Sequence, residues 1–245
     1  MPSPGRSSRD SSARQRSGFR AQRHHPQFRR FPLTPDSIAE LLEPYVSLPD
    51  GQAVGVATEE DVWPEIYSQL IIYLELIMKW NARMNLTAVR TPEEIVRRHF
   101  GESLFVGAYL GACGTLLDFG SGAGFPGVPI QLLRPDVRVT LAESHGKKAA
   151  FLQEVVRSLK LPTEVWAGRV ETMPAERRFD VVALRAVEGM DRAVGEAGLR
   201  AAGRVLILGT ARHSVHPGLA ENFRMDEPVP LPESNDGVLW IGHRC

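Results

Sequence analysis

The stretch that decides the fold is LLDFGSGAGFPGVPI, residues 116–130, an apolar run that ends in a burst of glycines. The run predicts a buried strand, and residues 126–133 read as the helix that follows it. A glycine-rich turn between a first strand and a helix places backbone N–H groups at the carboxyl edge of a sheet, where ligands bind. Glycine also lets a bulky ligand approach the main chain without meeting a Cβ. We therefore expect a cofactor at Gly120, Gly122 and Gly124.

Two classes of cofactor fit this turn. Read from Gly122, it spells G-x-G-x-x-G, which is typical of dinucleotide-binding oxidoreductases. Read from Asp118, it spells D-x-G-x-G-x-G, and an acid there repels a pyrophosphate but attracts the positively charged methionine moiety of S-adenosylmethionine. Pro126 also removes a donor that a pyrophosphate needs at a helix start. Glu143, at the end of the second predicted strand, can accept hydrogen bonds from ribose hydroxyls in either case. The residues favour S-adenosylmethionine, and an NAD-dependent oxidoreductase stays the alternative.

Strands and helices alternate after residue 115. Strands are predicted at 115–119, 137–143, 163–167, 179–185 and 203–209, with helices at 126–133, 147–160 and 189–200. This order predicts right-handed crossovers and a mostly parallel sheet, hence an α/β fold. Residues 223–231 and 238–243 read as a final antiparallel pair.

Helical patterns dominate the region before residue 113. Helices are predicted at 34–47, at 59–80 and from Thr91 to about Leu110, the last starting with a capping box closed by Glu94. The chain is thus expected to divide into a disordered Arg/Ser-rich arm at 1–31, an N-terminal helical region at 32–112 and a Rossmann-like core at 113–245.

The net charge of zero hides an asymmetry. Residues 1–30 contain eight arginines and one acidic residue, so the rest of the chain holds 21 basic and 28 acidic residues. Because residues 1–31 have almost no large aliphatic side chains, they are predicted to be disordered. An RNA-attracting arm, an organellar transit peptide and a dispensable extension behind a mis-set start codon all remain open for this segment.

Cysteine content and hydropathy exclude several classes of protein. Cys113 and Cys245 lie far apart, which argues against a disulfide framework and a zinc cluster and favours a reducing compartment, so we expect a cytoplasmic protein without a metal. The stretch from Ile66 to Leu74 is free of charge but well short of a membrane span, so no membrane partner is expected.

Five stretches resemble one family, the RsmG (GidB) methyltransferases. They are WNARMNLTAVRTPEEIVRRHFGES from Trp80, DFGSGAGFPGVPI from Asp118, ESHGKKAAFLQEV from Glu143, GRVE from Gly168 and FDVVALRAV from Phe179. They occur in family order and cover most of residues 60–190. The resemblance implies a class I S-adenosylmethionine-dependent methyltransferase fold with an N-terminal helical cap, and methylation of guanine N7 in 16S ribosomal RNA.

The resemblance also implies roles for residues of the cofactor pocket. Glu143 holds the ribose hydroxyls, and Val170 and Glu171 contact the adenine. The methionine and ribose side is formed by Gly120, Gly122, Gly124 and Phe125, with Asp118 just before them. Arg185, at the end of the fourth strand, matches an arginine near both cofactor and target base, and it is the catalytic candidate.

Contacts with RNA are expected from basic residues around this pocket. Arg169 matches another family arginine, and Lys147 and Lys148 begin a helix, where the helix dipole disfavours cations unless a phosphate is bound. Arg97, Arg98 and His99 are candidates for a second RNA contact, and a histidine such as His99 is more often capped or at the core edge than catalytic. The family lysine after the fifth strand is absent here.

The implied methyl transfer requires few catalytic side chains. Guanine N7 is an unprotonated acceptor, so it can attack a sulfonium methyl group without a general base. Catalysis is then mainly positioning of an unpaired guanine. Small-subunit ribosomal RNA, or its ribonucleoprotein particle, is the expected partner of a monomeric enzyme. A methyltransferase acting on a protein or small molecule, and a non-catalytic RNA-binding module, remain alternatives.

Overall fold

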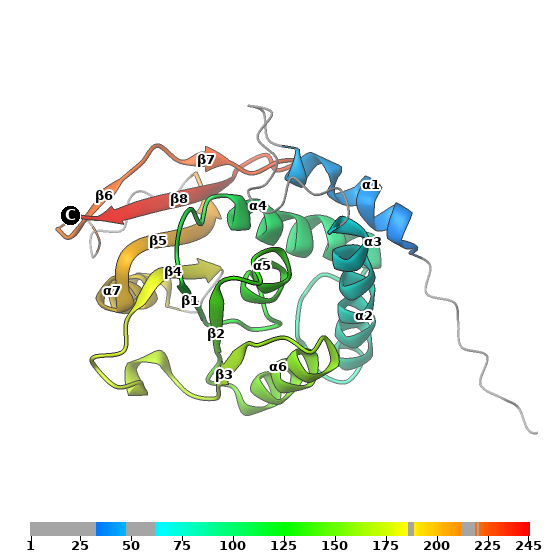
Figure 1. The fold of residues 1–245 in the computed structure, drawn as a ribbon, viewed down its shortest axis with the longest axis horizontal. Helices are drawn as coiled ribbons and strands as arrows, with labels where there is room; N and C mark the ends of the chain where they lie inside the picture. Colours follow the sequence, from blue (N-terminus) through cyan, green and yellow to red (C-terminus); the bar gives the residue numbers. More distant parts are fainter. Residues whose placement is uncertain (1–32, 48–61, 186–188, 212–218, 220) are drawn as a thin grey trace, which may run out of the picture. The chain divides into compact units, whose positions relative to one another are not determined.

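An eight-stranded mixed sheet organises the part of the chain that the structure describes (Figure 1). The structure is a computed structural model, and it describes residues 33–47, 62–185, 189–211, 219 and 221–245. The predicted arm at 1–31 lies outside these residues. Residues from 33 onward belong to one unit of the chain, so the predicted boundary at residue 112 stays a prediction.

Five parallel strands form the body of the sheet in the order β3-β2-β1-β4-β5. They are β1 (Thr115–Phe119), β2 (Arg138–Ala142), β3 (Glu164–Trp166), β4 (Phe179–Arg185) and β5 (Ala201–Thr210). Each agrees with its predicted strand to within a few residues. The strand order reverses between β1 and β4, which is where open α/β sheets bind ligands.

The C-terminal strands differ from the prediction. Strand β8 (Gly237–Arg244) runs antiparallel to β5, and the predicted strand at 223–231 is two short strands, β6 (Phe223–Met225) and β7 (Val229–Pro230). Both pair with β8. Pro228 lies between the two strands and has no N–H to donate, which explains why the pairing is interrupted rather than continuous.

Helices cover both faces of the sheet (Figure 1). Helix α7 (Met190–Arg200) packs with Val194 and Ala197 in a buried cluster with Leu184 and Ile207 of the sheet. On the other face lie α5 (Gly127–Leu133) and α6 (Gly146–Ser158). The expected class I methyltransferase fold, a mostly parallel sheet preceded by helices, is confirmed.

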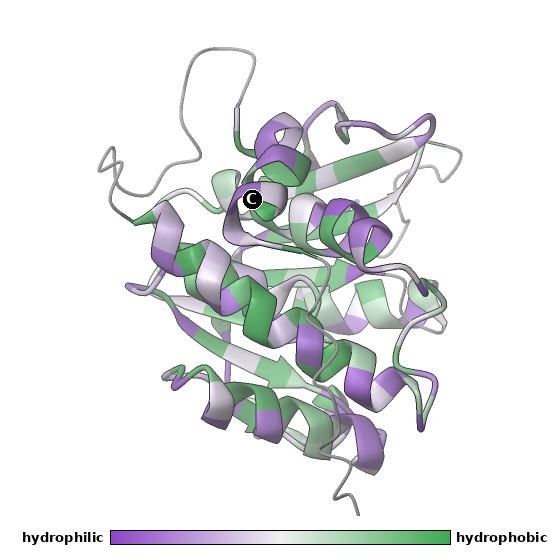
Figure 2. Cartoon of the chain, turned by 90° about the vertical axis from the view of Figure 1, so that its right-hand side faces the viewer, coloured by the Kyte–Doolittle hydropathy of each residue, from purple (hydrophilic) through white to green (hydrophobic). Residues whose placement is uncertain are grey.

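The N-terminal helices are α1 (Pro35–Val46), α2 (Trp63–Asn81), α3 (Pro92–Glu94) and α4 (Glu102–Ala108). Stripes of apolar residues run along helices on this side of the molecule (Figure 2). A π-helical segment, η1 (Ile95–Gly101), joins α3 to α4 without a break. The predicted helix from Thr91 to about Leu110 is therefore confirmed in extent, but its π-helical part was not predicted. No helix among the described residues is long and apolar enough to cross a membrane.

The helix α2 is tied to the core by polar contacts. The hydroxyl of Tyr73 donates to the Ala123 carbonyl in the glycine turn. Trp80 Nε1 donates to Glu154 Oε2 on α6 at 2.9 Å. Helix α2 therefore contacts both the glycine turn and α6.

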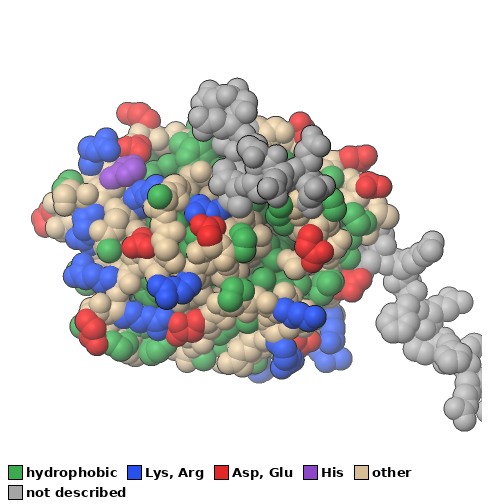
Figure 3. Space-filling model, viewed as in Figure 1, with side chains coloured by type: hydrophobic (Ala, Val, Ile, Leu, Met, Phe, Trp, Pro, Cys, Tyr) green, Lys and Arg blue, Asp and Glu red, His purple; other side chains and the backbone are tan. Residues whose placement is uncertain are grey.

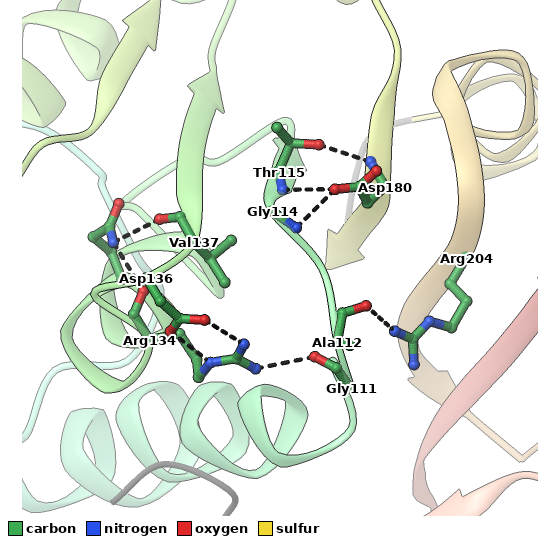
Figure 4. Close-up of polar contacts among 10 residues, drawn as sticks. Gly111, Ala112, Gly114, Thr115, Arg134, Asp136, Val137, Asp180 and Arg204 are labelled. Carbon is green, nitrogen blue, oxygen red and sulfur yellow. Dashed lines mark hydrogen bonds and ion pairs between the residues drawn. The ribbon is translucent and has the colours of Figure 1, made fainter.

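The amino-terminal end of the sheet is fixed separately, away from the glycine turn (Figure 4). Asp180 Oδ2 accepts hydrogen bonds from the N–H groups of Gly114 and Thr115, at 2.7 and 2.9 Å. Arg134 and Arg204 donate to carbonyls of residues 111 and 112, each at 3.1 Å. These bonds satisfy the backbone entering β1, so β1 delivers its carboxyl end to a fixed position.

Candidate active site

A cavity of about 750 Å³ lies at the carboxyl ends of β1, β2 and β4. It is lined at these strand ends by Phe119, Ala142 and Arg185. The glycine turn forms one side of the cavity, and the segment around η1 contributes His99 to another. The other predicted residues that line it are Gly120, Gly122, Phe125, Glu143, Val170, Glu171, Lys148 and Arg169.

The glycine turn uses two of its glycines for different purposes. Gly122 has φ of +58°, and a Cβ added there meets no atom closer than 3.9 Å, so this glycine provides the left-handed turn and leaves space beside it. Gly124 has φ of +95°, and a Cβ there comes within 2.5 Å of the Tyr73 hydroxyl. Gly124 therefore permits close packing on α2, and it is absent from the cavity lining.

Asp118 is fully buried and also lies outside the cavity lining. Side chains alternate along a strand, so Asp118 faces the start of α5 rather than the same side as its neighbours. Its Oδ2 accepts a hydrogen bond from the Gly127 N–H at 3.0 Å, and its Oδ1 has no partner among the described residues. Burial, with a smaller contribution from Glu143, raises the pKa of Asp118 to about 7.

Glu143 joins the second strand to the glycine turn. Its Oε2 accepts from the Gly122 N–H at 2.9 Å, and its Oε1 accepts from the His145 N–H at 2.6 Å. The side chain is largely buried but lines the cavity. Each carboxylate oxygen has further lone pairs, so Glu143 can still accept hydrogen bonds from a ligand.

Val170 and Glu171 lie in a 3₁₀ turn, η2 (Val170–Thr172), after β3. Val170 is buried and presents an apolar surface to the cavity. Glu171 forms an ion pair with Arg192 of α7 at 3.1 Å, and both residues also line the cavity.

Arg185 is held by two groups from the helix that contains η1. Its Nη2 donates to Glu102 Oε2 at 2.6 Å and to the Arg98 carbonyl at 2.7 Å. Both side chains of the ion pair are only 13% exposed. Burial raises the pKa of Glu102 while Arg185 opposes that effect, so the two charges depend on each other. The Arg185 Nη1 is buried and has no partner among the described residues, although the guanidinium lies 5.9 Å from the Phe125 ring centroid.

The predicted RNA contacts separate into two groups. Lys148 and Arg169 line the cavity, and Arg169 is exposed at its mouth. Lys147 and Arg98 are exposed but absent from the lining, and Arg98 contributes its backbone carbonyl to Arg185.

Sequence reasoning left His99 between an RNA contact and the core edge, and it overlooked Thr87. Both line the cavity, with His99 Nε2 at 2.6 Å from Thr87 Oγ1. Both residues lie in the stretch from Trp80 to Ser103, which is one of the five that resemble the family, and this shared stretch could have indicated that they act together.

Comparison with known proteins places this geometry in a family. The sequence model for GidB, described as rRNA small subunit methyltransferase G, matches residues 66–214. The chain belongs to the GidB family. Ribosomal RNA small subunit methyltransferase G of Nitrosomonas europaea is 48% identical over 126 residues, which cover 51% of this chain and 58% of that protein. The protein of the same name from Xanthomonas euvesicatoria is 39% identical over 166 residues, covering 66% of this chain and 78% of that protein.

The match to GidB relatives is partial in length. The chain spans 58% of the Nitrosomonas europaea protein and 63% of a Pseudomonas aeruginosa protein of the same name. Among solved structures, a mutant of MtNAS is similar with a TM-score of 0.52 at 16% identity, covering 86% of each chain. That similarity concerns the fold alone.

Proposed function

We propose that this chain is an S-adenosylmethionine-dependent methyltransferase that modifies N7 of a guanine in small-subunit ribosomal RNA. The observation that carries the proposal is the cavity bounded by the glycine turn and by the buried Arg185 guanidinium, in a chain of the GidB family. The names of its relatives, which refer to methylation of small-subunit ribosomal RNA, support this substrate.

The residues of the cavity fit S-adenosylmethionine. Its volume of about 750 Å³ lies within the range of roughly 300–1,000 Å³ typical of cofactor sites. Open space beside Gly122 admits a ligand to the main chain, and Glu143 retains acceptor capacity for ribose hydroxyls. Val170 offers an apolar contact for a base. These three features correspond to the methionine, ribose and adenine ends of the cofactor.

The chain's own contribution to the reaction is positioning and a suitable electrostatic environment. The chemistry supplied by bound S-adenosylmethionine is an electrophilic methyl group on a sulfonium sulfur. Arg185 and Glu102 form a pair with no net charge, so this wall adds no net repulsion toward a cationic cofactor. The pair holds the guanidinium still, and its Nη1 is left as a donor for a ligand.

Binding of RNA depends on local basic residues rather than on net charge. Lys and Arg side chains are mixed with Asp and Glu on the face drawn in Figure 3. We assign phosphate contacts to Lys148 and Arg169, which line the cavity, and to Lys147 and Arg98, each of which is next in sequence to a lining residue. A cytoplasmic monomer that acts on the RNA or on its ribonucleoprotein particle completes the proposal.

The decisive experiment incubates the full chain with methyl-labelled S-adenosylmethionine and either purified small-subunit RNA or assembled subunits. Label in one N7-methylguanine, mapped by mass spectrometry, is the expected result. Label in protein or small molecules from an RNA-depleted extract, with none in RNA, refutes the RNA substrate. Calorimetry with S-adenosylmethionine and with NADH tests the oxidoreductase alternative. That alternative predicts that NADH binds and S-adenosylmethionine does not.

A further inference from the structure

The imidazole of His99 has two nitrogens in different surroundings. Nε2 lies 2.6 Å from Thr87 Oγ1, whereas Nδ1 is buried without a hydrogen-bond partner among the described residues. The ring packs against Phe125 with centroids 4.7 Å apart. A buried polar atom in the wall of a cavity is costly unless a ligand satisfies it, so this nitrogen requires an explanation.

The contact between Thr87 and His99 fits a proton on Nδ1. Thr87 Oγ1 already accepts a hydrogen bond from the Val89 N–H at 3.2 Å. A hydrogen bond donated by this hydroxyl to His99 Nε2 places the imidazole proton on Nδ1, and this is the tautomer that the inference uses. This tautomer is assigned from the hydrogen-bond network.

The imidazole is also uncharged. Burial, and then the positive charges of Arg185 and Arg98, lower the pKa of His99 to about 3, against a weaker opposing effect of the Arg98 carbonyl. That carbonyl also accepts a hydrogen bond from Arg185 Nη2 at 2.7 Å. His99 therefore presents a neutral N–H donor.

A second unpartnered donor faces the same aromatic ring. Arg185 Nη1 is buried without a partner among the residues that the structure describes, and the guanidinium carbon lies 5.9 Å from the centroid of Phe125. Two N–H donors, one neutral and one cationic, thus flank one aromatic side chain in one cavity. A ligand that satisfies both donors needs a hydrogen-bond acceptor, and one that packs on Phe125 needs a flat ring.

The geometry points to His99 as a specificity-determining residue, whose Nδ1–H acts with Arg185 Nη1–H to bind O6 of the target guanine beside the Phe125 ring. Guanine has the acceptor O6 next to N7, whereas adenine has an amino group there. Adenine would leave both protein donors unpaired and would place its own amino group, a third donor, against them, so a site of this kind rejects adenine strongly. The inference rests on the proposed function, because it names the feature of the base that the same cavity selects.

Two matched pairs of variants test the inference. His99→Asn keeps a short N–H donor near the position of Nδ1, and His99→Leu removes it. Thr87→Ser keeps the hydroxyl that contacts His99 Nε2, and Thr87→Val removes it. We expect His99→Leu and Thr87→Val to lower kcat/KM for small-subunit RNA by about 10- to 100-fold, the usual effect of one lost hydrogen bond to a buried group. His99→Asn and Thr87→Ser should retain most of the wild-type value.

The substrate provides the complementary change. Once the methylated guanine is mapped, an RNA fragment carrying 2-aminopurine at that position lacks O6 but keeps N7. The wild type should lose about 10- to 100-fold in kcat/KM on this fragment. His99→Leu should lose less than the wild type on this fragment, because only the bond from Arg185 to O6 then remains to be removed. Equal discrimination by the wild type and His99→Leu overturns the inference.

Two readouts besides activity complete the test. In the wild type with labelled histidine, the ¹⁵N resonance of His99 Nδ1 should shift on addition of guanosine monophosphate and stay in place with adenosine monophosphate. Calorimetry with S-adenosylhomocysteine should give the same Kd for wild type and His99→Leu. A weaker Kd in the variant means that the donors bind the cofactor instead, which overturns the inference. Failure of the proposed function is different, since the wild type then transfers no methyl group to RNA at all.

Discussion

Replacing Asp118 by Asn should stabilise the cofactor-free protein, and the gain should depend on pH. The carboxyl group is fully buried, and its pKa is raised from 3.8 to about 7, mainly by burial. Below pH 4 the group is protonated in both folded and unfolded chains, so it costs nothing. As the pH rises toward 7, the unfolded chain loses the proton that the folded chain keeps, and folding becomes less favourable.

The size of the effect follows from the pKa difference. One pKa unit corresponds to about 1.4 kcal/mol, so Asp118 costs about 4 kcal/mol above pH 7, where it is ionised, and about 1.5 kcal/mol at pH 5, where the folded chain still holds the proton. In Asp118→Asn the amide oxygen can still accept from the Gly127 N–H. The free energy of unfolding of the variant should therefore exceed that of the wild type by about 4 kcal/mol at pH 8.

Urea denaturation at pH 5 and pH 8 measures this difference. Asp136→Asn is the matched control, because Asp136 is exposed and Arg134 holds its pKa below the usual value. Its stabilising effect is present at neutral pH and lost as the pH falls through that lowered pKa, so the control should lose stability at pH 8, by less than about 1 kcal/mol. A less stable Asp118→Asn variant at pH 8, or a difference that is equal at both pH values, refutes the reasoning.

Three further variants test the neighbourhood of the cavity. Arg185→Ala should lower methyl transfer more than 100-fold, since positioning and a cationic donor are both lost, with an unchanged circular dichroism spectrum; wild-type turnover would exclude the assigned role. Glu102→Gln removes the charge that balances Arg185, and thermal and urea unfolding should show a loss of about 1–3 kcal/mol together with lower kcat at similar cofactor Kd. Tyr73→Phe deletes the bond to the Ala123 carbonyl and should cost about 1–2 kcal/mol in urea unfolding; an unchanged stability would show that α2 does not hold the glycine turn.

The sheet could be predicted from sequence because each parallel strand is a short apolar run ending at a polar or glycine-rich turn. Leu116, Leu117 and Phe119 are nearly inaccessible, and the run that contains them identified β1. The strand ends then indicated the cavity, and Glu143 and Arg185 do line it. Local sequence was sufficient here because the carboxyl edge of a parallel sheet collects these residues whatever the details of packing.

Local sequence was insufficient where a residue's role depends on a distant partner. The π-helical segment η1 lets the Arg98 carbonyl meet Arg185, which is 87 residues further along the chain. Nothing in the helical periodicity of residues 91–110 encodes that contact. The surroundings of His99 are likewise set by Thr87, Phe125 and Arg185, and two of these residues are distant in sequence.

The arrangement of charge explains why a destabilising acid is buried in the turn. The wall opposite the glycine turn is uncharged overall, since His99 is neutral and Arg185 is balanced by Glu102. Asp118 and Glu143, by contrast, belong to the strand ends that support the turn. A cation bound in the cavity that Glu143 lines favours the ionised form of Asp118 and lowers its pKa, so the cost of ionisation falls when such a ligand is present. Asn at position 118 cannot ionise, so its charge state does not respond to a bound cation. We therefore expect Asp118→Asn to be more stable but to bind the sulfonium cofactor more weakly, relative to the uncharged thioether product, than the wild type does.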